Sequence, residues 1–265
     1  MVTRFSLPSG QKLRPTRRWR IGNSMKQTQQ TSVITGASSG IGLGLAHAFL
    51  RAGFNVVANS RRITASGVLS PSENLLLVDG DIGDPAVARE LVSSAAKRFG
   101  TVDVLINNAG IFVPKAFHEY SQEEFQRVLH TNLAGFFHVS QEAVRQMRTS
   151  GGGNILSITT TLAQQPVAGV SAALTSLTKG GLNAVTRGLA IEYAKDGIRV
   201  NAIAPGIVDT PMHKAENHEF LKGLHPIHRI ATVAEIAEAA LFLVRGSFIT
   251  GEVLHVDGGA HAGKW

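Results

Sequence analysis

One lysine is isolated in the second half of the chain. Lys179 is the only charged residue between Thr149 and Thr186, a stretch made of apolar, small and uncharged polar residues. Proteins rarely place an ammonium group in such surroundings without a partner, because an unpaired buried charge loses its hydration. Lys179 is therefore a candidate functional residue.

A glycine-rich segment near the start of the chain is suited to binding phosphate groups. It reads T-G-A-S-S-G-I-G from Thr35 to Gly42 and lies between an apolar run and an amphipathic run. Glycines let the backbone approach a pyrophosphate, and the following helix N-terminus supplies N–H donors. A glycine-rich turn without a ligand is the less favoured alternative. We predict a dinucleotide site that includes Gly36, Ser38, Ser39, Gly40, Ile41 and Gly42.

The residues after the second apolar run bear on which dinucleotide is bound. An acidic side chain there would accept a hydrogen bond from the ribose and repel a 2′-phosphate. This chain has Asn59, Ser60, Arg61 and Arg62 instead. Two guanidinium groups beside a small hydroxyl suit a phosphate, although two solvated loop arginines are the alternative. We predict that Ser60, Arg61 and Arg62 favour NADP(H) over NAD(H), and that the later pair Asp81 and Ile82 borders the adenine.

Short apolar runs and longer amphipathic runs alternate along the chain and would position these residues. We expect strands at 32–34, 55–58, 75–78, 102–106, 155–158, 198–203 and 253–256, and helices at 41–51, 85–99, 123–147, 172–193 and 233–244. The helix at 123–147 is interrupted in pattern near Gly135, and the link 61–74 has room for one helical turn at most. Continuously apolar strands separated by helices predict one α/β domain over 31–265, a doubly wound parallel sheet with ligands at its carboxyl edge.

Seven ordered motifs resemble those of the short-chain dehydrogenase/reductase family, in particular its 3-oxoacyl-reductase-like members. The similarity covers residues 31–259 and comprises T-G-A-S-S-G-I-G at 35, D-I at 81, N-N-A-G at 107, T-N-L-A-G at 131, K at 179, R-V-N-A-I-A-P-G at 199 and I-T-G-E-V-L-H-V-D-G-G at 249. The resemblance implies a Rossmann-type sheet of about seven strands, a nicotinamide cofactor and a homotetramer with the two long helices at one interface.

The resemblance also implies roles for individual residues. It assigns cofactor contacts to Asn107, Ala109, Gly110, Pro205, Gly206, Ile207, Val208 and Thr210, and it places the loop from about Asp209 to Arg229 over the substrate. By the same resemblance Lys179 binds the nicotinamide ribose and lowers the pKa of a tyrosine one helical turn earlier. Asn132 would anchor a water molecule, and Thr160 would hold the substrate oxygen.

The chain departs from the family pattern at the proton donor. Thr175 stands four residues before Lys179, where the family has its tyrosine. The two tyrosines, Tyr120 and Tyr193, are far from this position in the sequence. An aliphatic hydroxyl is a weaker acid than a phenol with its pKa of about 10, and losing a positioned general acid slows a reaction about 10²- to 10⁴-fold. The spacing to Thr175 also leaves the choice between Thr160 and Thr161 open.

Two functions follow from this departure. The first is an NADP(H)-dependent oxidoreductase for a carbonyl or secondary alcohol, with Thr175 or a water molecule as a weaker donor. The second is a cofactor-binding protein without useful turnover, acting as a sensor or as a partner subunit. Four histidines of the predicted substrate loop are read as solvated side chains, with a proton donor or a metal site as alternatives; they are His213, His218, His225 and His228.

Composition narrows the remaining possibilities. The chain has no cysteine, which excludes disulfides and thiolate metal sites, and no apolar run approaches the ~18 residues of a membrane span. Residues 1–30 hold seven basic residues and no acid, while the rest of the chain has 19 of each sign. This arginine-rich, acid-free leader loosely resembles a transit peptide. The favoured interpretations are a disordered leader over residues 1–30 or a start of translation at Met25, before a cytoplasmic domain. The expected partners are a small molecule and other copies of the chain, with no nucleic acid, membrane or metal.

Overall fold

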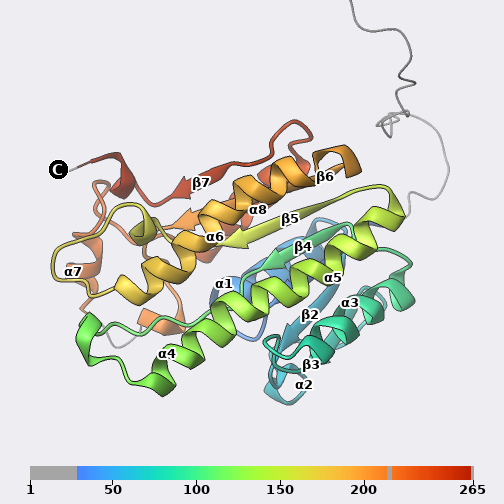
Figure 1. The fold of residues 1–265 in the computed structure, drawn as a ribbon, viewed down its shortest axis with the longest axis horizontal. Helices are drawn as coiled ribbons and strands as arrows, with labels where there is room; N and C mark the ends of the chain where they lie inside the picture. Colours follow the sequence, from blue (N-terminus) through green and yellow to red (C-terminus); the bar gives the residue numbers. More distant parts are fainter. Residues whose placement is uncertain (1–28, 214–216, 264–265) are drawn as a thin grey trace, which may run out of the picture.

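The computed structural model of the protein describes residues 29–213 and 217–263, so the predicted leader lies outside the described residues except for its last two positions. Seven parallel strands form one sheet in the order β3-β2-β1-β4-β5-β6-β7 (Figure 1). Their bounds are Thr31–Thr35 for β1, Asn55–Ser60 for β2, Leu75–Asp79 for β3, Val104–Asn107 for β4, Gly153–Ile158 for β5, Ile198–Pro205 for β6 and Val253–Val256 for β7. The predicted doubly wound Rossmann-type fold is confirmed.

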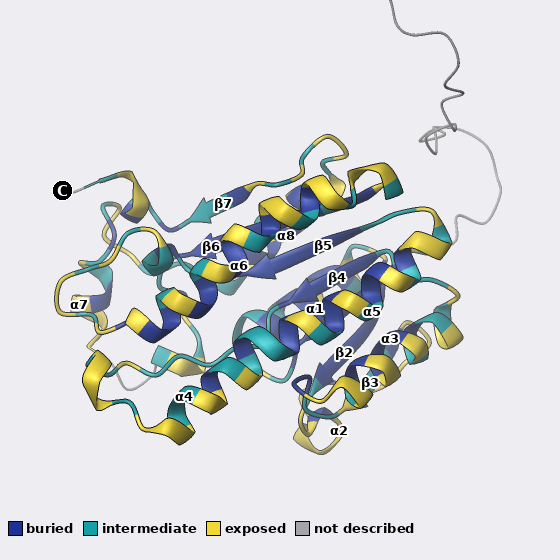
Figure 2. Ribbon diagram, viewed as in Figure 1, coloured by how far each residue is buried: buried dark blue, intermediate teal, exposed yellow. Residues whose placement is uncertain are grey.

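Helices cover both faces of the sheet and leave it buried between them (Figure 2). One apolar core joins the sheet to α1 (Gly40–Arg51) and α8 (Val233–Arg245). A second core joins the opposite face to α3 (Pro85–Phe99), α5 (Gly135–Ser150) and α6 (Ala173–Glu192). Neighbouring residues of a strand point to opposite faces, which is why Val33 belongs to one core and Ile34 to the other.

Local sequence determines where several helices begin. Asp84 accepts a hydrogen bond from the backbone of Ala86, and Pro85 occupies the first helical position of α3. Ser121 forms a reciprocal capping box with Glu124 at the start of α4 (Gln122–Leu129). A capping box of the same kind begins α8. No helix in the described part of the chain is long and apolar enough to cross a membrane.

The expected interruption of the helix 123–147 near Gly135 is confirmed: the segment consists of α4, a π-helical turn (His130–Ala134) and α5, which begins at Gly135. Two other element predictions need correction. The expected strand 102–106 is shifted to Val104–Asn107, and Asp103 just before it accepts with its carboxylate from the backbone N–H of Thr31 at 2.9 Å. A short helix, α7 (His218–Lys222), was not predicted. The link after β2 does contain a single helical turn, α2 (Ile63–Ser66), as expected.

Candidate active site

The glycine-rich loop after β1 packs directly against the start of the N-N-A-G segment. Gly36 has φ +67°, and a Cβ atom on it would lie 2.8 Å from the Cα of Ala109. A Cβ on Gly42 would overlap the carbonyl oxygen of Gly36. Both positions therefore need glycine, because the backbone conformation and the close approach leave no room for a side chain. The loop leads into α1, where Ser39 makes no side-chain cap to the first-turn N–H groups.

Two polar residues that sequence reasoning did not single out fix this loop. The hydroxyl of Thr35 accepts from the backbone N–H groups of Asn108 and Ala109, both at 3.1 Å. The side-chain amide of Asn108 donates to the carbonyls of Thr35 at 2.9 Å and Gly36 at 3.2 Å. Both residues stand at the carboxyl end of a buried strand, and this position is the signal that could have identified them.

The residues predicted to surround the adenosine lie at the ends of β2 and β3. Ser60 is half-buried, whereas Arg61 and Arg62 are exposed and form no ion pair with any other described residue. The strand register pairs Ser60 with Asp79. The carboxylate of Asp79 accepts from the hydroxyl and backbone N–H of Thr64, and these hydrogen bonds lower the pKa of Asp79. An acid thus lies near the predicted phosphate site, contrary to the sequence-based assumption that none does.

Asp81 and Ile82 extend this edge toward the π-helical turn. Asp81 accepts from the backbone N–H of Gly83 at 2.9 Å and lies 3.3 Å from the His130 ring nitrogen. The buried side chain of Ile82 packs on Gly135, where a Cβ atom would be 2.5 Å away. The two residues that are predicted to border the adenine therefore lie between β3 and the start of α5.

Lys179 lies at the centre of the candidate site and is only 8% exposed. Its ammonium nitrogen donates to the carbonyl of Ile158 at 2.7 Å, at the end of β5. A Cβ on Gly110 would be 2.9 Å from this nitrogen and 3.3 Å from the side-chain oxygen of Asn132. Burial lowers the pKa of Lys179 to about 8. The three predicted residues Lys179, Gly110 and Asn132 therefore meet at one place.

Asn132 joins the loop after β4 to α6. Its side-chain oxygen accepts from the backbone N–H of Ile111 at 2.9 Å. Its amide nitrogen donates to the Ile111 carbonyl at 3.1 Å and to the hydroxyl of Thr178 at 3.2 Å. The π-helical turn at this point orients the amide, a common use of such single turns at functional sites.

The threonines after β5 differ in what their hydroxyl groups do. Thr161 is buried and donates to the Asp257 carboxylate at 2.6 Å. Thr160 is half-buried, and its oxygen accepts from the backbone N–H of Leu162 at 3.3 Å. The hydroxyl proton of Thr160 is thus left for another acceptor, whereas that of Thr161 is engaged. Thr175 is buried on α6, one turn before Lys179.

Neither tyrosine takes the place of the missing phenol. The Tyr120 hydroxyl donates to the carbonyl of Val113 at 2.6 Å, in the segment before α4. Tyr193 follows the last residue of α6, at the end of that helix remote from Thr175. No tyrosine hydroxyl is therefore available beside Lys179.

The four loop histidines do not assemble a metal site. Among the described residues no three His, Asp or Glu side chains are arranged to hold a metal ion. His225 is instead buried against the segment after β6, where its Nε2 accepts from the backbone N–H of Ile207 at 2.9 Å. Thr210 of the same segment approaches α1, because a Cβ on Gly40 would be 3.3 Å from its side chain.

A cleft of about 460 Å³ opens next to the threonines. Most of its lining is apolar; the lining residues are Lys115, Ala116, Phe117, Leu162, Pro166, Val170, Ser171, Ala172, Ala173 and Ser176. The ammonium group of Lys115 is paired with both oxygens of Glu124, at 2.9 and 2.8 Å. The cleft therefore offers an apolar surface whose one cation is already neutralised.

Comparisons with known proteins agree with this arrangement. Residues 36–261 match a family model described as enoyl-(acyl carrier protein) reductase. A cis-4-hydroxycyclohexanecarboxylate dehydrogenase from Sinomonas cyclohexanicum is 36% identical over 87% of this chain and 96% of its own. A 3-ketoacyl-(acyl-carrier-protein) reductase from Brucella melitensis, solved with NADH, is 33% identical with a TM-score of 0.82, over 88% of this chain and 98% of its own.

A second solved structure, ElxO with NADP bound, has a TM-score of 0.82 and 29% identity, over 89% of this chain and 100% of its own. The family match spans residues 36–261, a range that contains most of the glycine-rich loop and the whole of α6. The chain therefore belongs to the short-chain dehydrogenase/reductase family, as a 3-oxoacyl-reductase-like oxidoreductase that transfers hydride with a nicotinamide cofactor.

Proposed function

We propose that this protein is an NADP(H)-preferring oxidoreductase that acts, with low turnover, on the carbonyl or secondary alcohol group of an apolar small molecule. The buried ammonium group of Lys179, with no carboxylate partner among the residues described, is the observation that carries this proposal. A buried charge of this kind disfavours folding. A function accounts for it if the ammonium group binds hydroxyl groups and supplies protons at the site.

The residues around Lys179 fit a dinucleotide. Gly36 and Gly42 let the loop pack closely on the segment after β4 and on itself, and the first turn of α1, whose N–H groups have no side-chain cap, would receive the pyrophosphate. Ser60, Arg61 and Arg62 would hold the adenosine end, and Ile207, Val208 and Thr210 would flank the nicotinamide, which supplies the hydride when it is bound.

The proton chemistry falls to this chain's own residues. Thr160, whose oxygen accepts from Leu162 and whose hydroxyl proton is left for another acceptor, would donate that proton to a substrate carbonyl oxygen. When hydride reaches the carbonyl carbon, that oxygen must gain a proton, from the Thr175 hydroxyl or a water molecule. Lys179, with a pKa of about 8, can replace that proton near neutral pH. The weak acidity of Thr175 makes this step slow.

The apolar cleft supports an uncharged substrate. Its cation, Lys115, is held by Glu124 and would have to leave that pair to bind a carboxylate. An alicyclic or aliphatic ketone would therefore bury its carbon skeleton against Phe117, Leu162 and Val170.

The absence of a phenol favours a second candidate, a cofactor-binding protein that acts as a sensor or partner subunit. NADPH titration beside a turnover assay over a panel of uncharged ketones separates the two. Binding with turnover supports the oxidoreductase, and binding without turnover on any ketone supports the second candidate.

Replacing Arg61 should weaken NADPH binding selectively. Arg61→Ala removes one charge-assisted contact to a 2′-phosphate, so we expect the Kd for NADPH to rise about tenfold while that for NADH hardly changes. Fluorescence titration of both cofactors measures this, and Arg89→Ala, at an exposed arginine of α3, is the matched control. Equal affinity of the unaltered protein for NADPH and NADH would contradict the preference.

The long helices should form an interface in a homotetramer. α5 exposes Phe137 (56%), and α6 exposes Leu177 (57%) and Ile191 (81%). Light scattering at micromolar concentration should give four times the mass of one chain, and Ile191→Asp should lower this mass by placing a charge in the interface. Val68→Asp, at an exposed residue beyond α2, should leave the mass unchanged. A monomer mass for the unaltered chain would refute the assembly.

A further inference from the structure

His225 fills a space between two segments that are distant in sequence. It comes from the loop after α7, is only 3% exposed, and lies against Gly206 after β6 and Gly258 after β7. A Cβ on Gly206 would be 2.5 Å from Nε2 of the imidazole, and one on Gly258 would be 3.3 Å from the Cβ of His225. The ring therefore occupies a place that exists because both neighbours lack side chains.

The hydrogen bond to this ring requires a neutral imidazole. The backbone N–H of Ile207 donates to Nε2 at 2.9 Å, so Nε2 must carry a lone pair and the ring proton must be on Nδ1. Nδ1 is itself buried and has no partner of ordinary hydrogen-bond geometry among the described residues. Protonation would place a second N–H against the Ile207 N–H, and the bond could not form.

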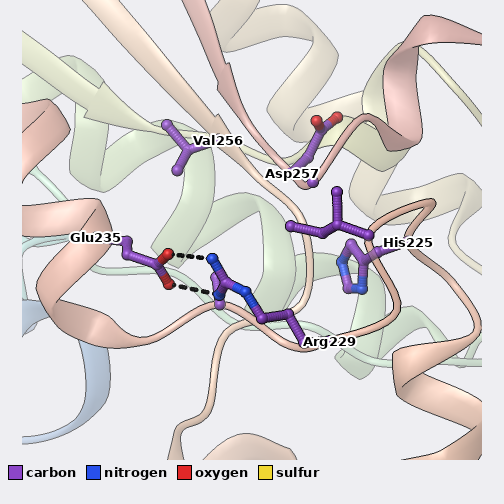
Figure 3. A pocket seen from close by; sticks show the side chains of 8 residues that line it. His225, Arg229, Glu235, Val256 and Asp257 are labelled. Carbon is purple, nitrogen blue, oxygen red and sulfur yellow. Dashed lines mark hydrogen bonds and ion pairs between the residues drawn. The ribbon is translucent and has the colours of Figure 1, made fainter.

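Charged residues from three elements line, together with His225, a small cavity of about 50 Å³ (Figure 3). They are Arg229 of the same loop, Glu235 of α8 and Asp257 after β7. Arg229 is paired with Glu235, and Asp257 accepts from Thr161. Burial lowers the pKa of His225 and, with a smaller contribution from Arg229, outweighs Asp257 and the backbone of Leu221, which raise it.

We propose that His225 is a positioning residue for the nicotinamide: as a neutral acceptor it fixes the Gly206–Ile207 backbone, and its protonation releases that segment and weakens cofactor binding. This inference rests on the proposed function, because that function includes the binding of nicotinamide by the segment after β6. The contribution of the bond is complete at neutral pH. Because burial lowers the pKa of His225 in the folded chain, the bond is lost only when the pH falls below the ordinary histidine value of about 6.5.

Two variants test the acceptor role. His225→Gln supplies a side-chain oxygen that can accept from Ile207 but cannot titrate, and His225→Leu keeps comparable bulk with no acceptor. Calorimetric titration with NADP⁺ from about pH 5 to pH 8 measures the affinity of each protein for the cofactor. On acidification, the affinity of the unaltered protein should fall about tenfold more than that of His225→Gln. Because both proteins bind the same cofactor, titration of the 2′-phosphate cancels in this comparison. His225→Leu should bind about tenfold more weakly at neutral pH.

A second measurement needs no cofactor. Hydrogen exchange should show the Ile207 amide protected at neutral pH and less protected at pH 5 in the unaltered protein, but equally protected at both values in His225→Gln. His228→Gln, at an exposed histidine of the same loop, is the control and should keep the unaltered profile. Protection that does not change with pH, or a glutamine variant that titrates like the unaltered protein, overturns the proposal. If no nicotinamide cofactor binds at any pH, the proposed function fails, and the Ile207 amide still decides whether His225 holds the segment.

Discussion

Replacing Thr175 by tyrosine is expected to raise the rate of carbonyl reduction about tenfold or more on at least one ketone of a broad panel. The phenol would stand one helical turn before Lys179, whose ammonium group favours the phenolate and so lowers the phenol pKa toward neutrality. The site already contains the buried lysine, Asn132 and a threonine with a free hydroxyl proton after β5. The substitution would supply the missing acid to this arrangement.

Steady-state oxidation of NADPH measures this gain, and Thr175→Phe is the matched control because it adds the ring without the hydroxyl. The rate of the tyrosine variant should fall as the pH rises through the pKa of the new phenol. The phenylalanine variant should show neither the increase in rate nor this fall with pH. If tyrosine instead lowers an already substantial native rate, the native site has its own efficient donor and the account of Thr175 as a weak one is wrong.

Lys179→Met is expected to lower turnover about 100-fold or more and, at the same time, to make the fold more stable. Methionine fills a similar volume without a charge. Burial lowers the pKa of Lys179 from its ordinary value of 10.5 to about 8, so folding is disfavoured by about 1 to 3 kcal/mol at neutral pH, after the bond to Ile158 is allowed for.

The sign of this effect fixes its pH dependence. Between about pH 8 and 10.5 the unfolded lysine keeps its proton while the folded one has lost it, so the unaltered protein gains stability as the pH rises. The advantage of the methionine variant should therefore be largest below pH 8 and fade toward pH 10.5. Chemical denaturation at both ends of this range measures it, with Lys97→Met, at an exposed lysine of α3, as the control. A destabilised variant, or one that retains turnover, would show that Lys179 is a structural cation.

Features that depend on one segment were predictable from the sequence. The glycine-rich turn, the apolar strands and the isolated lysine each carry their signal within about 20 residues, because backbone space, burial and charge are local properties. Even the break in the long helix was visible, although the pattern could not distinguish the π-helical turn at 130–134 from an ordinary kink. The start of β4 was predicted two residues too early, and a tertiary hydrogen bond from the Thr31 N–H to the Asp103 carboxylate lies at that point.

Features that depend on two distant segments were not predictable. The choice between Thr160 and Thr161 rests on Asp257, which is 96 residues from Thr161 along the chain. Asp79 lies opposite Ser60 because β2 and β3 pair in this register, and no spacing rule in the sequence indicates that pairing. The burial of His225 depends on two glycines in different loops. In each case the missing information is which segments become neighbours in the folded state.

The strand order of the sheet also determines how the domain can assemble during synthesis. The chain emerges from the ribosome N-terminus first, so β1, β2 and β3, which are consecutive neighbours, can pair while the rest is still being made. The other edge of β1 stays unpaired until β4 is made, because its partners lie in that strand. Ser32 of β1, for example, pairs with Val104 of β4. Until then β1 presents unpaired backbone groups and apolar side chains on both faces. In the finished sheet each strand from β4 to β7 lies at the edge formed by the one before it, so strands that are synthesised later lie progressively farther from β1 and the dinucleotide loop.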